Sequence, residues 1–485
     1  MTATMEAPAR AGQATGARRS PPAELLAALR ALLGERFTTN RAVCLQHGTD
    51  ESPYPPQPPD AVAFAASTAE VSALVRLCAQ HATPVIAFGV GSSIEGHVLA
   101  VQGGVCIDLS RMDQVVSVDA QDLTATAQAG VTREGLNAAL AGSGFFFSVD
   151  PGANATLGGM AATAASGTNT VRYGTMRENI VSLTVVLADG AVIRTARRAR
   201  KTSAGYCLTQ LFAGSEGTLG IITELTVKLH PLPEAVAAAV VNFDSVEGAV
   251  QTVIEAMQMG VPLARAEFLD ALTIRAINAH SRTTLRQAHT LFLEFSGSAA
   301  QVQEQGAVLQ ELAASHGGGD FEWATRPEER SRLWTPRHHA YFASLQLRPG
   351  SRSFTTDACV PLSRLAQCLA DTLADIERSG LTAPVFGHVG DGNFHCLLLV
   401  DPNDGAEVAA AEGVSQRLSR RAIQADGTCS GEHGVGLHKM TYLTEEHGED
   451  AVEVMRRIKR ALDPLDILNP GKVVDPREDP RDATA

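Results

Sequence analysis

The sequence of 485 residues lacks several patterns that would point to familiar functions. None of its eight cysteines stands in a Cys-x-x-Cys pair, which excludes the common zinc ribbons, redox motifs and ferredoxin-type clusters. No apolar run reaches the roughly 18 residues that a membrane-spanning helix needs. Positive charge is also scarce, because the net charge is −13, and this argues against a nucleic-acid partner, which requires a basic face.

The sequence has an ordinary globular composition, and the pattern of its helix and strand signals changes along the chain. Hydrophobic residues make up 45% of a chain long enough for two or three domains. Helix and strand signals alternate up to residue 233, and strand–helix units follow from residue 236. We therefore expect an α+β fold with a disordered tail (1–20), an N-terminal helical segment (21–53), a first domain (54–233), a second domain (234–425), a C-terminal segment (426–475) and a second disordered tail (476–485).

Three segments of the first domain are rich in glycine and other small residues. Residues 86–96 read IAFGVGSSIEG, residues 150–174 read DPGANATLGGMAATAASGTNTVRYG, and residues 214–222 read GSEGTLGII. Glycine lets backbone N–H groups approach phosphate oxygens closely, and few bulky side chains remain to build a core. The three segments together indicate that a large anionic cofactor, such as a dinucleotide, lies against the backbone. The alternative is three independent tight turns.

Two further segments bring histidine and glutamate together among glycines. Residues 386–395 read FGHVGDGNFH, and residues 428–436 read TCSGEHGVG. His388, His395 and Glu432 can form a set of two histidines and one carboxylate around a divalent metal, with positions left open for a substrate. Asn393 could position that ligand. Zn²⁺, Mn²⁺ and Fe²⁺ all accept such a set, and the alternative is a group of structural histidines.

These segments resemble the FAD-binding domain of the vanillyl-alcohol-oxidase/PCMH flavoprotein superfamily. From about residue 50 to residue 474 the chain resembles the FAD-binding oxidoreductase/transferase type 4 family, in the branch of the cytochrome-type D-lactate dehydrogenases. The resemblance implies a PCMH-type FAD-binding domain of two α/β subdomains and a cap domain with an antiparallel sheet flanked by helices. It implies non-covalent FAD lined by Gly89, Gly91, Ser92, Gly96, Asp150, Pro151, Gly152, Gly158, Gly159, Ser166, Gly167, Gly174, Glu216, Gly217, Gly220, Ile222 and Asn469.

The resemblance also implies roles for the residues of the second domain. His388, His395 and Glu432 match metal ligands, for which Zn or Mn is expected, and His433 matches a base that accepts the hydroxyl proton while the flavin accepts hydride at N5. Arg337 matches the residue that binds the substrate carboxylate. The neighbouring Arg330, Arg332 and His338 are expected to be structural or surface residues.

The expected substrate is D-lactate or a similar small D-2-hydroxy acid. In the family's dicarboxylate-using branch a lysine precedes the aspartate of the strand SFTTDACVP, whereas Thr356 precedes Asp357 here. A second substrate carboxylate would therefore lack its cation. Glycolate and D-2-hydroxyglutarate remain as alternative substrates. An oxygen-using oxidase and a non-catalytic electron-transfer subunit remain as alternative functions.

The expected partners are a small 2-hydroxy acid and an electron acceptor, either a cytochrome c or a quinone. A homodimer and a peripheral contact with a membrane stay open. Because the N-terminal 20 residues lack the apolar core of a secretory signal, we expect a cytoplasmic protein, and a position at the periphery of the inner membrane stays open. A mitochondrial location is the alternative.

Overall fold

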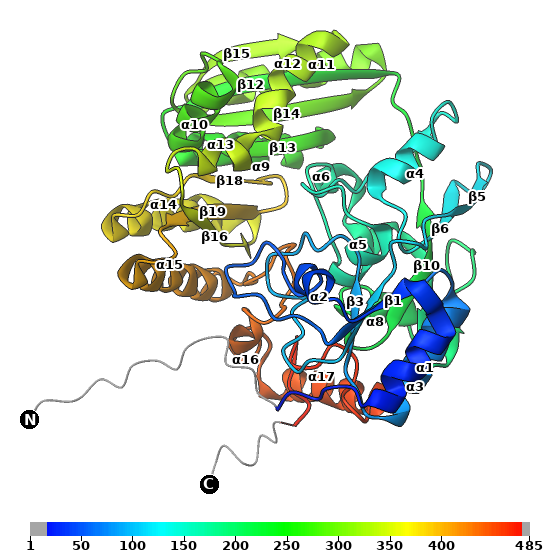
Figure 1. Cartoon of the computed structure of the whole chain (residues 1–485). Helices are drawn as coiled ribbons and strands as arrows, with labels where there is room; N and C mark the ends of the chain where they lie inside the picture. Colours follow the sequence, from blue (N-terminus) through cyan, green and yellow to red (C-terminus); the bar gives the residue numbers. More distant parts are fainter. Residues whose placement is uncertain (1–16, 478–485) are drawn as a thin grey trace, which may run out of the picture.

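The computed structural model describes residues 17–477, so the predicted tails lie almost entirely outside the described residues. The described chain forms a lower part with two sheets and an upper part with one large sheet, which are shown in Figure 1. No helix within residues 17–477 is both long and apolar enough to cross a bilayer. The mixture of helices and strands confirms the predicted α+β class.

The first sheet of the lower part has the strand order β1-β2-β4-β3. Its strands β2, β4 and β3 run parallel, and β1 is antiparallel to β2. Helices α1 and α3 bury their leucine faces against this sheet, and Ser67 caps α3. The bounds are α1 (Ala23–Leu33), η1 (Gly34–Arg36), β1 (Phe37–Thr38), α2 (Arg41–Gln46), β2 (Ala61–Phe64), α3 (Thr68–Gln80), β3 (Val85–Phe88) and β4 (Val105–Asp108).

The second sheet is antiparallel, with the order β5-β6-β10-β8-β9. Short helices follow its strands, and a ribbon of β7 and β11 lies outside it. The small residues of α5 allow close packing, because a Cβ on Gly158 would lie 2.6 Å from the Cβ of Ala129. The bounds are β5 (Val115–Asp119), β6 (Thr124–Gln128), α4 (Arg133–Ala139), β7 (Phe145–Phe146), α5 (Leu157–Thr163), α6 (Thr170–Tyr173), α7 (Met176–Asn179), β8 (Ile180–Val186), β9 (Val192–Arg194), α8 (Leu208–Phe212), β10 (Ile221–Lys228) and β11 (His230–Pro231).

The upper part, which we call the cap, is one antiparallel sheet with the order β15-β12-β14-β13-β18-β19-β16, and β17 also pairs with β19. This confirms the predicted antiparallel sheet of the cap domain. The bounds are β12 (Ala235–Phe243), β13 (Leu263–Leu269), β14 (His289–Gly297), β15 (Gly318–Ala324), β16 (Arg352–Thr355), β17 (Ala358–Cys359), β18 (Val385–Gly387) and β19 (Asn393–Val400).

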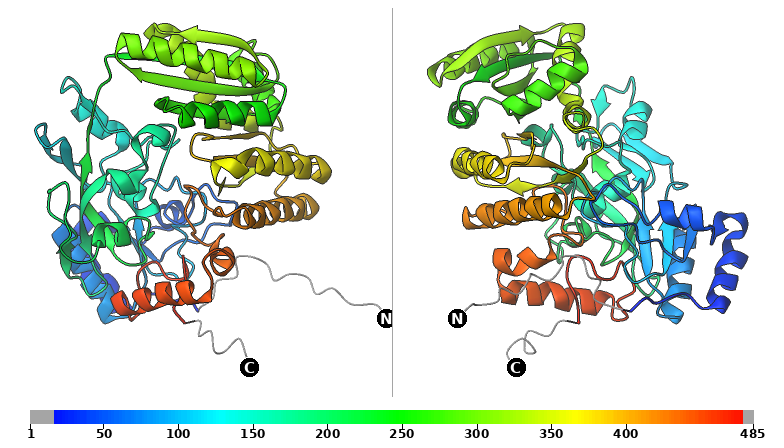
Figure 2. Two further views of the ribbon diagram at one scale, coloured as in Figure 1. Left: turned by 180° about the vertical axis from the view of Figure 1, so that it is seen from behind. Right: turned by 60° about the vertical axis from the view of Figure 1, so that its left-hand side comes forward.

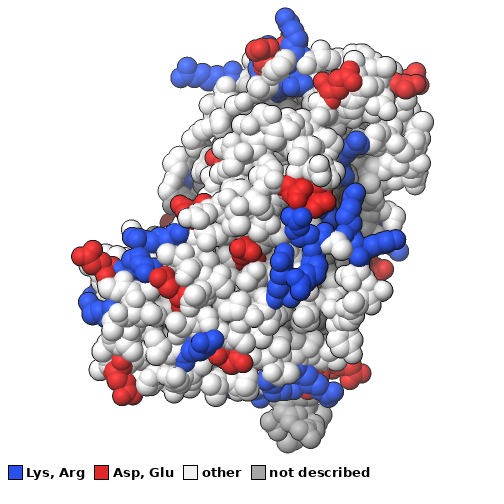
Figure 3. Space-filling model, turned by 90° about the vertical axis from the view of Figure 1, so that its right-hand side faces the viewer, with Lys and Arg blue, Asp and Glu red and all other residues white. Residues whose placement is uncertain are grey.

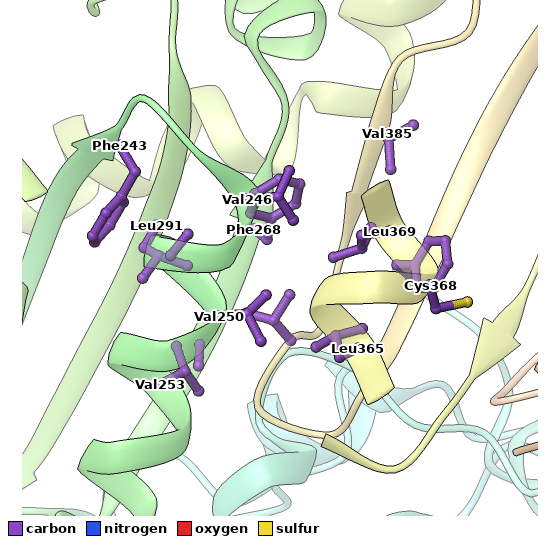
Figure 4. Packing of buried hydrophobic residues seen from close by; sticks show 14 of the residues in the cluster. Phe243, Val246, Val250, Val253, Phe268, Leu291, Leu365, Cys368, Leu369 and Val385 are labelled. Carbon is purple, nitrogen blue, oxygen red and sulfur yellow. The ribbon is translucent and has the colours of Figure 1, made fainter. Parts of the chain in front are cut away.

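Helices cover both faces of the cap sheet. The main core lies under α9 (Val246–Gln258), α11 (Ala299–Ser315), α14 (Leu362–Ser379) and α15 (Gly405–Gln424). Figure 4 shows Val250 of α9 facing Leu365 and Leu369 of α14 in this core. The opposite face packs against α10 (Ala271–Ser281), α12 (Pro327–His338) and α13 (Ala340–Leu345). Because side chains alternate along a strand, the second face also carries the polar residues described below.

After the cap, the chain returns to the lower part. It passes through η2 (Met440–Tyr442), α16 (Leu443–His447) and α17 (Glu449–Leu462), and Figure 2 shows α16 and α17 at the bottom of the molecule in both views. Leu468 then forms a parallel bridge with Val85, so the end of the chain extends the first sheet beside β3. Residues from both ends of the sequence therefore build the lower part.

Candidate active site

A cavity of about 880 Å³ lies between the lower part and the cap. This volume falls within the range of about 300–1,000 Å³ that is usual for cofactor and ligand sites. It is bordered by most of the residues proposed from the sequence, namely Gly89, Gly91, Ser92, Asp150, Pro151, Gly152, Gly158, Gly159, Ser166, Gly167, Glu216, Gly217, Gly220, Ile222, Arg337, His388, His395, Glu432, His433 and Asn469. One continuous space thus joins the glycine-rich segments to the histidines.

The lower wall of the cavity is formed mainly by backbone and small side chains. A Cβ on Gly152 would meet nothing within 4 Å, and one on Gly217 would meet only Ala87, at 3.9 Å. Gly217 also has φ +72°, a conformation that favours glycine. The wall is therefore open enough at these positions for a large ligand to lie against the main chain, as a dinucleotide would require.

Two predicted cofactor residues do not border the cavity. Gly96 has φ +81°, and a Cβ there would meet Leu437 at 3.0 Å and Tyr54 at 3.3 Å. Gly174 has φ +78° and ends α6, where a Cβ would meet Glu178 at 2.9 Å. Both glycines have positive φ angles in crowded surroundings, and their contact with the cofactor stays a prediction.

The loops around the cavity are held by buried polar contacts. Asn469 donates from Nδ2 to the carbonyl oxygens of His97 (3.1 Å) and Glu216 (2.8 Å). The carboxylate of Glu216 accepts hydrogen bonds from the backbone N–H groups of Val435 (2.7 Å) and Gly436 (2.8 Å). Asn469 and Glu216 therefore fasten the C-terminal segment to the glycine-rich loops at the edge of the cavity.

His388, His395 and Glu432 converge at the cap side of the cavity. Their ligand atoms all lie within 4.8 Å of one another. The Nε2 atoms of His388 and His395 lie 3.2 and 3.1 Å from the same oxygen, Oε1 of Glu432. The other oxygen of Glu432 accepts a hydrogen bond of 2.5 Å from Ser166, which belongs to the lower part.

The surroundings of the two histidines show which nitrogens can accept a cation. Nδ1 of His395 faces the carbonyl of Thr356 at 3.3 Å, and Nδ1 of His388 faces the carboxylate of Glu267 at 2.6 Å. Both partners only accept hydrogen bonds, so each Nδ1 carries a hydrogen, and each Nε2 faces Glu432 as the nitrogen that can bind a cation once it has lost its proton. Three acceptors that face one another repel unless a cation lies among them, so this set fits a divalent metal.

The electrostatics of the set agree with a positive charge at this point. Burial lowers the pKa of His388, but the carboxylates of Glu267 and Glu432 outweigh it and hold the pKa well above its ordinary value. Burial likewise raises the pKa of Glu432, while His388 and His395 hold it well below its ordinary value. Zinc, manganese and ferrous ions would all find suitable nitrogen and oxygen donors here.

His433 lies beside this set and borders the cavity. Its ring stacks on His395 with centroids 4.9 Å apart and an angle of 11° between the rings. Its Nδ1 lies 3.6 Å from Oε1 of Glu95 and 3.9 Å from Oδ2 of Asp357, both fully buried side chains. Lys439 lies 3.0 Å from Glu95 and 3.4 Å from Asp357, which partly balances the two negative charges. An imidazole between two carboxylates can accept a proton readily.

Asp357 anchors the loop that carries Glu432 and His433. Its Oδ2 accepts hydrogen bonds of 2.9 Å from the backbone N–H groups of both residues. Its Oδ1 accepts a hydrogen bond of 2.7 Å from Nδ2 of Asn393, which also donates to the carbonyl of Ala358. Asn393 does not border the cavity, so its predicted contact with the substrate is corrected: the side chain supports Asp357 from behind.

Arg337 comes from α12 and borders the cavity from the cap side, as the metal set does. Its guanidinium pairs with the buried carboxylate of Glu267, through Nε at 3.1 Å and Nη2 at 2.5 Å. His338 borders the cavity and is exposed, in agreement with the prediction that it is a surface or structural residue. Burial and the guanidinium groups of Arg265 and Arg337 lower the pKa of His338 to about 4, so the ring is neutral at pH 7.

Sequence reasoning missed several residues of the site. Glu267 and Arg265 lie on one face of β13, and their site partners come from α12, from the loop after β18 and from the lower part. Glu95 lies inside the glycine-rich segment 86–96, for which the sequence predicted contacts of the backbone with a cofactor and no role for the Glu95 side chain. Arg265 and Glu267 are two residues apart on β13, which predicts that they share one face of the sheet. The residues around them do not indicate which face borders the cavity.

Comparison with known proteins places this geometry in context. Residues 59–196 match the model of an FAD binding domain, and residues 232–473 match the C-terminal domain of FAD linked oxidases. A probable mitochondrial D-lactate dehydrogenase of Danio rerio is 51% identical over 91% of this chain and 89% of its own length. The mitochondrial D-lactate dehydrogenase [cytochrome] of Arabidopsis thaliana is 42% identical over 95% and 82%. A glycolate oxidase subunit of Bacillus subtilis is 32% identical over 90% and 94%.

Solved structures with the same fold are more distant in sequence. A 4-ethylphenol oxidase from Gulosibacter chungangensis gives a TM-score of 0.77 at 19% identity, over 96% of this chain and 99% of its own. A p-cresol methylhydroxylase gives 0.76 at 18% identity, over 94% and 97%. These similarities confirm the predicted PCMH-type fold, and the matched FAD-binding domain supports FAD as the ligand of the glycine-lined wall.

Proposed function

The chain belongs to the family of FAD-linked oxidases that includes the cytochrome-type D-lactate dehydrogenases, and from this premise we propose that it oxidises D-lactate to pyruvate. One observation carries the proposal. Arg337, His433 and the set of His388, His395 and Glu432 all face the cavity whose other wall is the glycine-rich surface. An anion-binding group, a base and a metal site thus share one space with the place for a flavin.

In the proposed reaction, each side chain acts on a different part of the substrate. Arg337 binds the carboxylate through the guanidinium edge that Glu267 leaves free, because a planar guanidinium suits a carboxylate. His433 accepts the proton of the hydroxyl group, and the neighbouring Glu95 and Asp357 stabilise the resulting imidazolium. Bound FAD supplies the two-electron acceptor, and a divalent ion held by His388, His395 and Glu432 supplies Lewis acidity that makes the hydroxyl more acidic.

The wall next to the metal set supports a substrate with a small apolar group. Phe386 lies opposite His395 in the pairing of β18 with β19, and Leu397 follows His395 on the same face of β19. Both side chains border the cavity and are nearly inaccessible. A methyl group fits such a wall, whereas a second carboxylate would lose its hydration there.

The guanidinium group of Arg265 is relevant to the alternative substrate class, a dicarboxylate such as D-2-hydroxyglutarate. The sequence lacks the lysine that would bind a second substrate carboxylate, but Arg265 borders the cavity and brings a second guanidinium group to it besides that of Arg337. It already lies 3.5 Å from Asp150 and 3.6 Å from Glu294, and it donates to Asn169. Because these partners occupy Arg265, we favour the monocarboxylate, and glycolate remains the second candidate.

We further propose that the electrons pass to a cytochrome or a quinone. The word "cytochrome" in the names of several relatives supports this choice. The same names carry the word "mitochondrial", which supports the mitochondrial alternative for the location over the cytoplasmic one.

The test is turnover of a panel of 2-hydroxy acids by the purified flavoprotein with an artificial dye as acceptor. The expected result is the highest kcat/KM for D-lactate, with much weaker turnover of glycolate, D-2-hydroxyglutarate and L-lactate. Absent turnover of D-lactate together with good turnover of another acid would refute the substrate assignment. Hydrogen peroxide formation in air would instead identify an oxygen-using oxidase.

A further inference from the structure

Glu267 lies where the metal set meets the residue proposed to bind the substrate carboxylate. It is on β13, and its side chain is 0% exposed. One carboxylate oxygen, Oε1, accepts a hydrogen bond of 2.6 Å from Nδ1 of His388. The other, Oε2, accepts from Nε and Nη2 of Arg337 at 3.1 and 2.5 Å. A single buried carboxylate therefore holds residues from two other elements, the loop after β18 and helix α12.

These contacts fix the orientation of both partners. Hydrogen bonding to Nδ1 leaves Nε2 of His388 as the acceptor that faces Glu432, which is the form required of a metal ligand. On Arg337, Glu267 occupies the edge formed by Nε and Nη2. Among the described residues, Nη1 has no hydrogen-bond partner, so the second edge of the guanidinium is left for an anion in the cavity.

The charges indicate that both contacts require a carboxylate. Nε and Nη2 of Arg337, which is always positively charged, both donate to Oε2 of Glu267, and this favours the ionised carboxylate. An ionised carboxylate accepts hydrogen bonds at both oxygens, whereas a neutral amide accepts at one and donates at the other. Glutamine at this position removes the negative charge that both His388 and Arg337 face, and its amide can accept hydrogen bonds from only one of them while its NH₂ group meets the other.

We propose that Glu267 is a positioning residue that sets the metal ligand His388 and the carboxylate-binding Arg337 together, so that one side chain aligns both ends of the bound hydroxy acid. The inference rests on the proposed function for the role of Arg337, while its claim about His388 stands on the metal set alone. A carboxylate that served only to stabilise the fold would not need to contact both groups.

The experiment compares Glu267→Gln with Asp375→Asn in the FAD-loaded protein. Asp375 is a suitable control, because it is also a buried carboxylate of the cap, pairs with Arg417 and Arg421, and lies on α14, on the face of the cap sheet opposite to α12, without bordering the cavity. Affinity for Mn²⁺ is measured by competition with a chelator, without any hydroxy acid. Anaerobic bleaching of the flavin by D-lactate at saturating Mn²⁺ then gives the apparent Kd for the substrate.

For Glu267→Gln we expect Mn²⁺ affinity to fall by about 10- to 100-fold, the usual effect of removing the group behind a metal-bound histidine. We also expect the apparent Kd for D-lactate to rise by about tenfold, since Arg337 loses its fixed orientation, which is worth about 1.4 kcal/mol. Asp375→Asn should change neither quantity more than about twofold. The visible spectrum should show bound flavin in both variants.

An unchanged Mn²⁺ affinity in Glu267→Gln overturns the proposal, whichever hydroxy acid the enzyme uses. If the wild-type flavin is not bleached by D-lactate, the proposed function is wrong, and the Mn²⁺ measurement still decides the role of Glu267. If Glu267→Gln does not fold, Glu267→Asp keeps the negative charge but is one methylene shorter and reaches one partner only. A loss of Mn²⁺ affinity of about threefold or more is then expected, and wild-type affinity refutes the proposal.

Discussion

Asp357 is the residue through which the site can be perturbed most informatively without touching the substrate. In Asp357→Asn, the amide oxygen can take the place of Oδ2 and keep the bonds from the N–H groups of Glu432 and His433. The amide NH₂ then faces Nδ2 of Asn393, at a position where the carboxylate accepts a hydrogen bond of 2.7 Å. Rotating Asn393 to avoid this sacrifices its bond to the carbonyl of Ala358. One buried hydrogen bond is lost either way, which costs about 1–3 kcal/mol of stability.

The effect on turnover comes from the lost charge. His433 becomes positive when it accepts the substrate proton, and its Nδ1 lies 3.9 Å from Oδ2 of Asp357. At an effective dielectric constant of about 20 this attraction is worth about 4 kcal/mol. Glu95 remains 3.6 Å away and Lys439 already offsets part of the field, so we expect a loss of about 3 kcal/mol in the transition state, or about a hundredfold in kcat.

The assay is steady-state oxidation of D-lactate with a dye acceptor, normalised to flavin content, with Asp375→Asn as the control for loss of a buried carboxylate in the cap. A kcat within threefold of wild type would refute the argument that Asp357 stabilises the charged base. The pKa of Asp357 gives a second readout. His433 and Lys439 outweigh burial and hold it below its ordinary value, so its ionised form stabilises the fold above about pH 4. The stability advantage of wild type over Asp357→Asn should shrink as the pH falls below that point.

Three further outcomes are expected. His433→Ala should retain flavin and metal but lose about 10²- to 10⁴-fold in kcat, as measured by flavin reduction; retained activity would exclude His433 as the base. His388→Ala should lose bound metal, measured by elemental analysis, and added Mn²⁺ should not restore turnover as it does in chelator-treated wild type. Burial lowers the pKa of Lys472 to about 7, so between pH 7 and pH 10 the unfolded chain holds a proton that the folded chain lacks, and stability rises with pH. Lys472→Met should flatten that rise in Tm, and an equal slope in both proteins would contradict the assignment.

The sequence predicted the parts of the site whose signals are local. His388 and His395 stand within eight residues of each other among glycines, and Glu432 and His433 are adjacent, so their patterns could be recognised without a fold. The register of β18 and β19 then explains why two of them meet, because Phe386 pairs with His395 and His388 follows just beyond. The four side chains border one cavity in the structure.

Residues whose partners are remote in sequence could not be found in this way. Glu267 meets His388 and Arg337 across 121 and 70 positions, and along its own strand it has no distinguishing neighbour. Glycines present a different difficulty, since Gly96 and Gly174 were expected beside the cofactor, but neither borders the cavity and both have positive φ angles among neighbouring side chains. A glycine indicates a backbone requirement, but the sequence alone does not distinguish a ligand from a neighbouring side chain as its cause.

Figure 3 shows that Lys and Arg gather on one face, although the whole chain carries a net charge of −13. Among the exposed basic residues of the described chain are Arg194, Arg197, Arg200 and Lys201, which follow or end β9, while Arg198 pairs with Asp119 and Asp122. A negative net charge therefore does not exclude a local concentration of positive charge, because the net charge describes only the average over the whole surface.

The bridge between Val85 and Leu468 has a consequence for how this protein is made. The strand beside it, β3, is synthesised early, whereas its neighbour at the sheet edge arrives only after the complete cap has left the ribosome. Contacts so distant in sequence form slowly, because a long loop must close before they are gained. The glycine-rich wall thus acquires the segment that includes Asn469 only after the whole cap has been synthesised, and we expect the capture of a flavin to be linked to this step of folding.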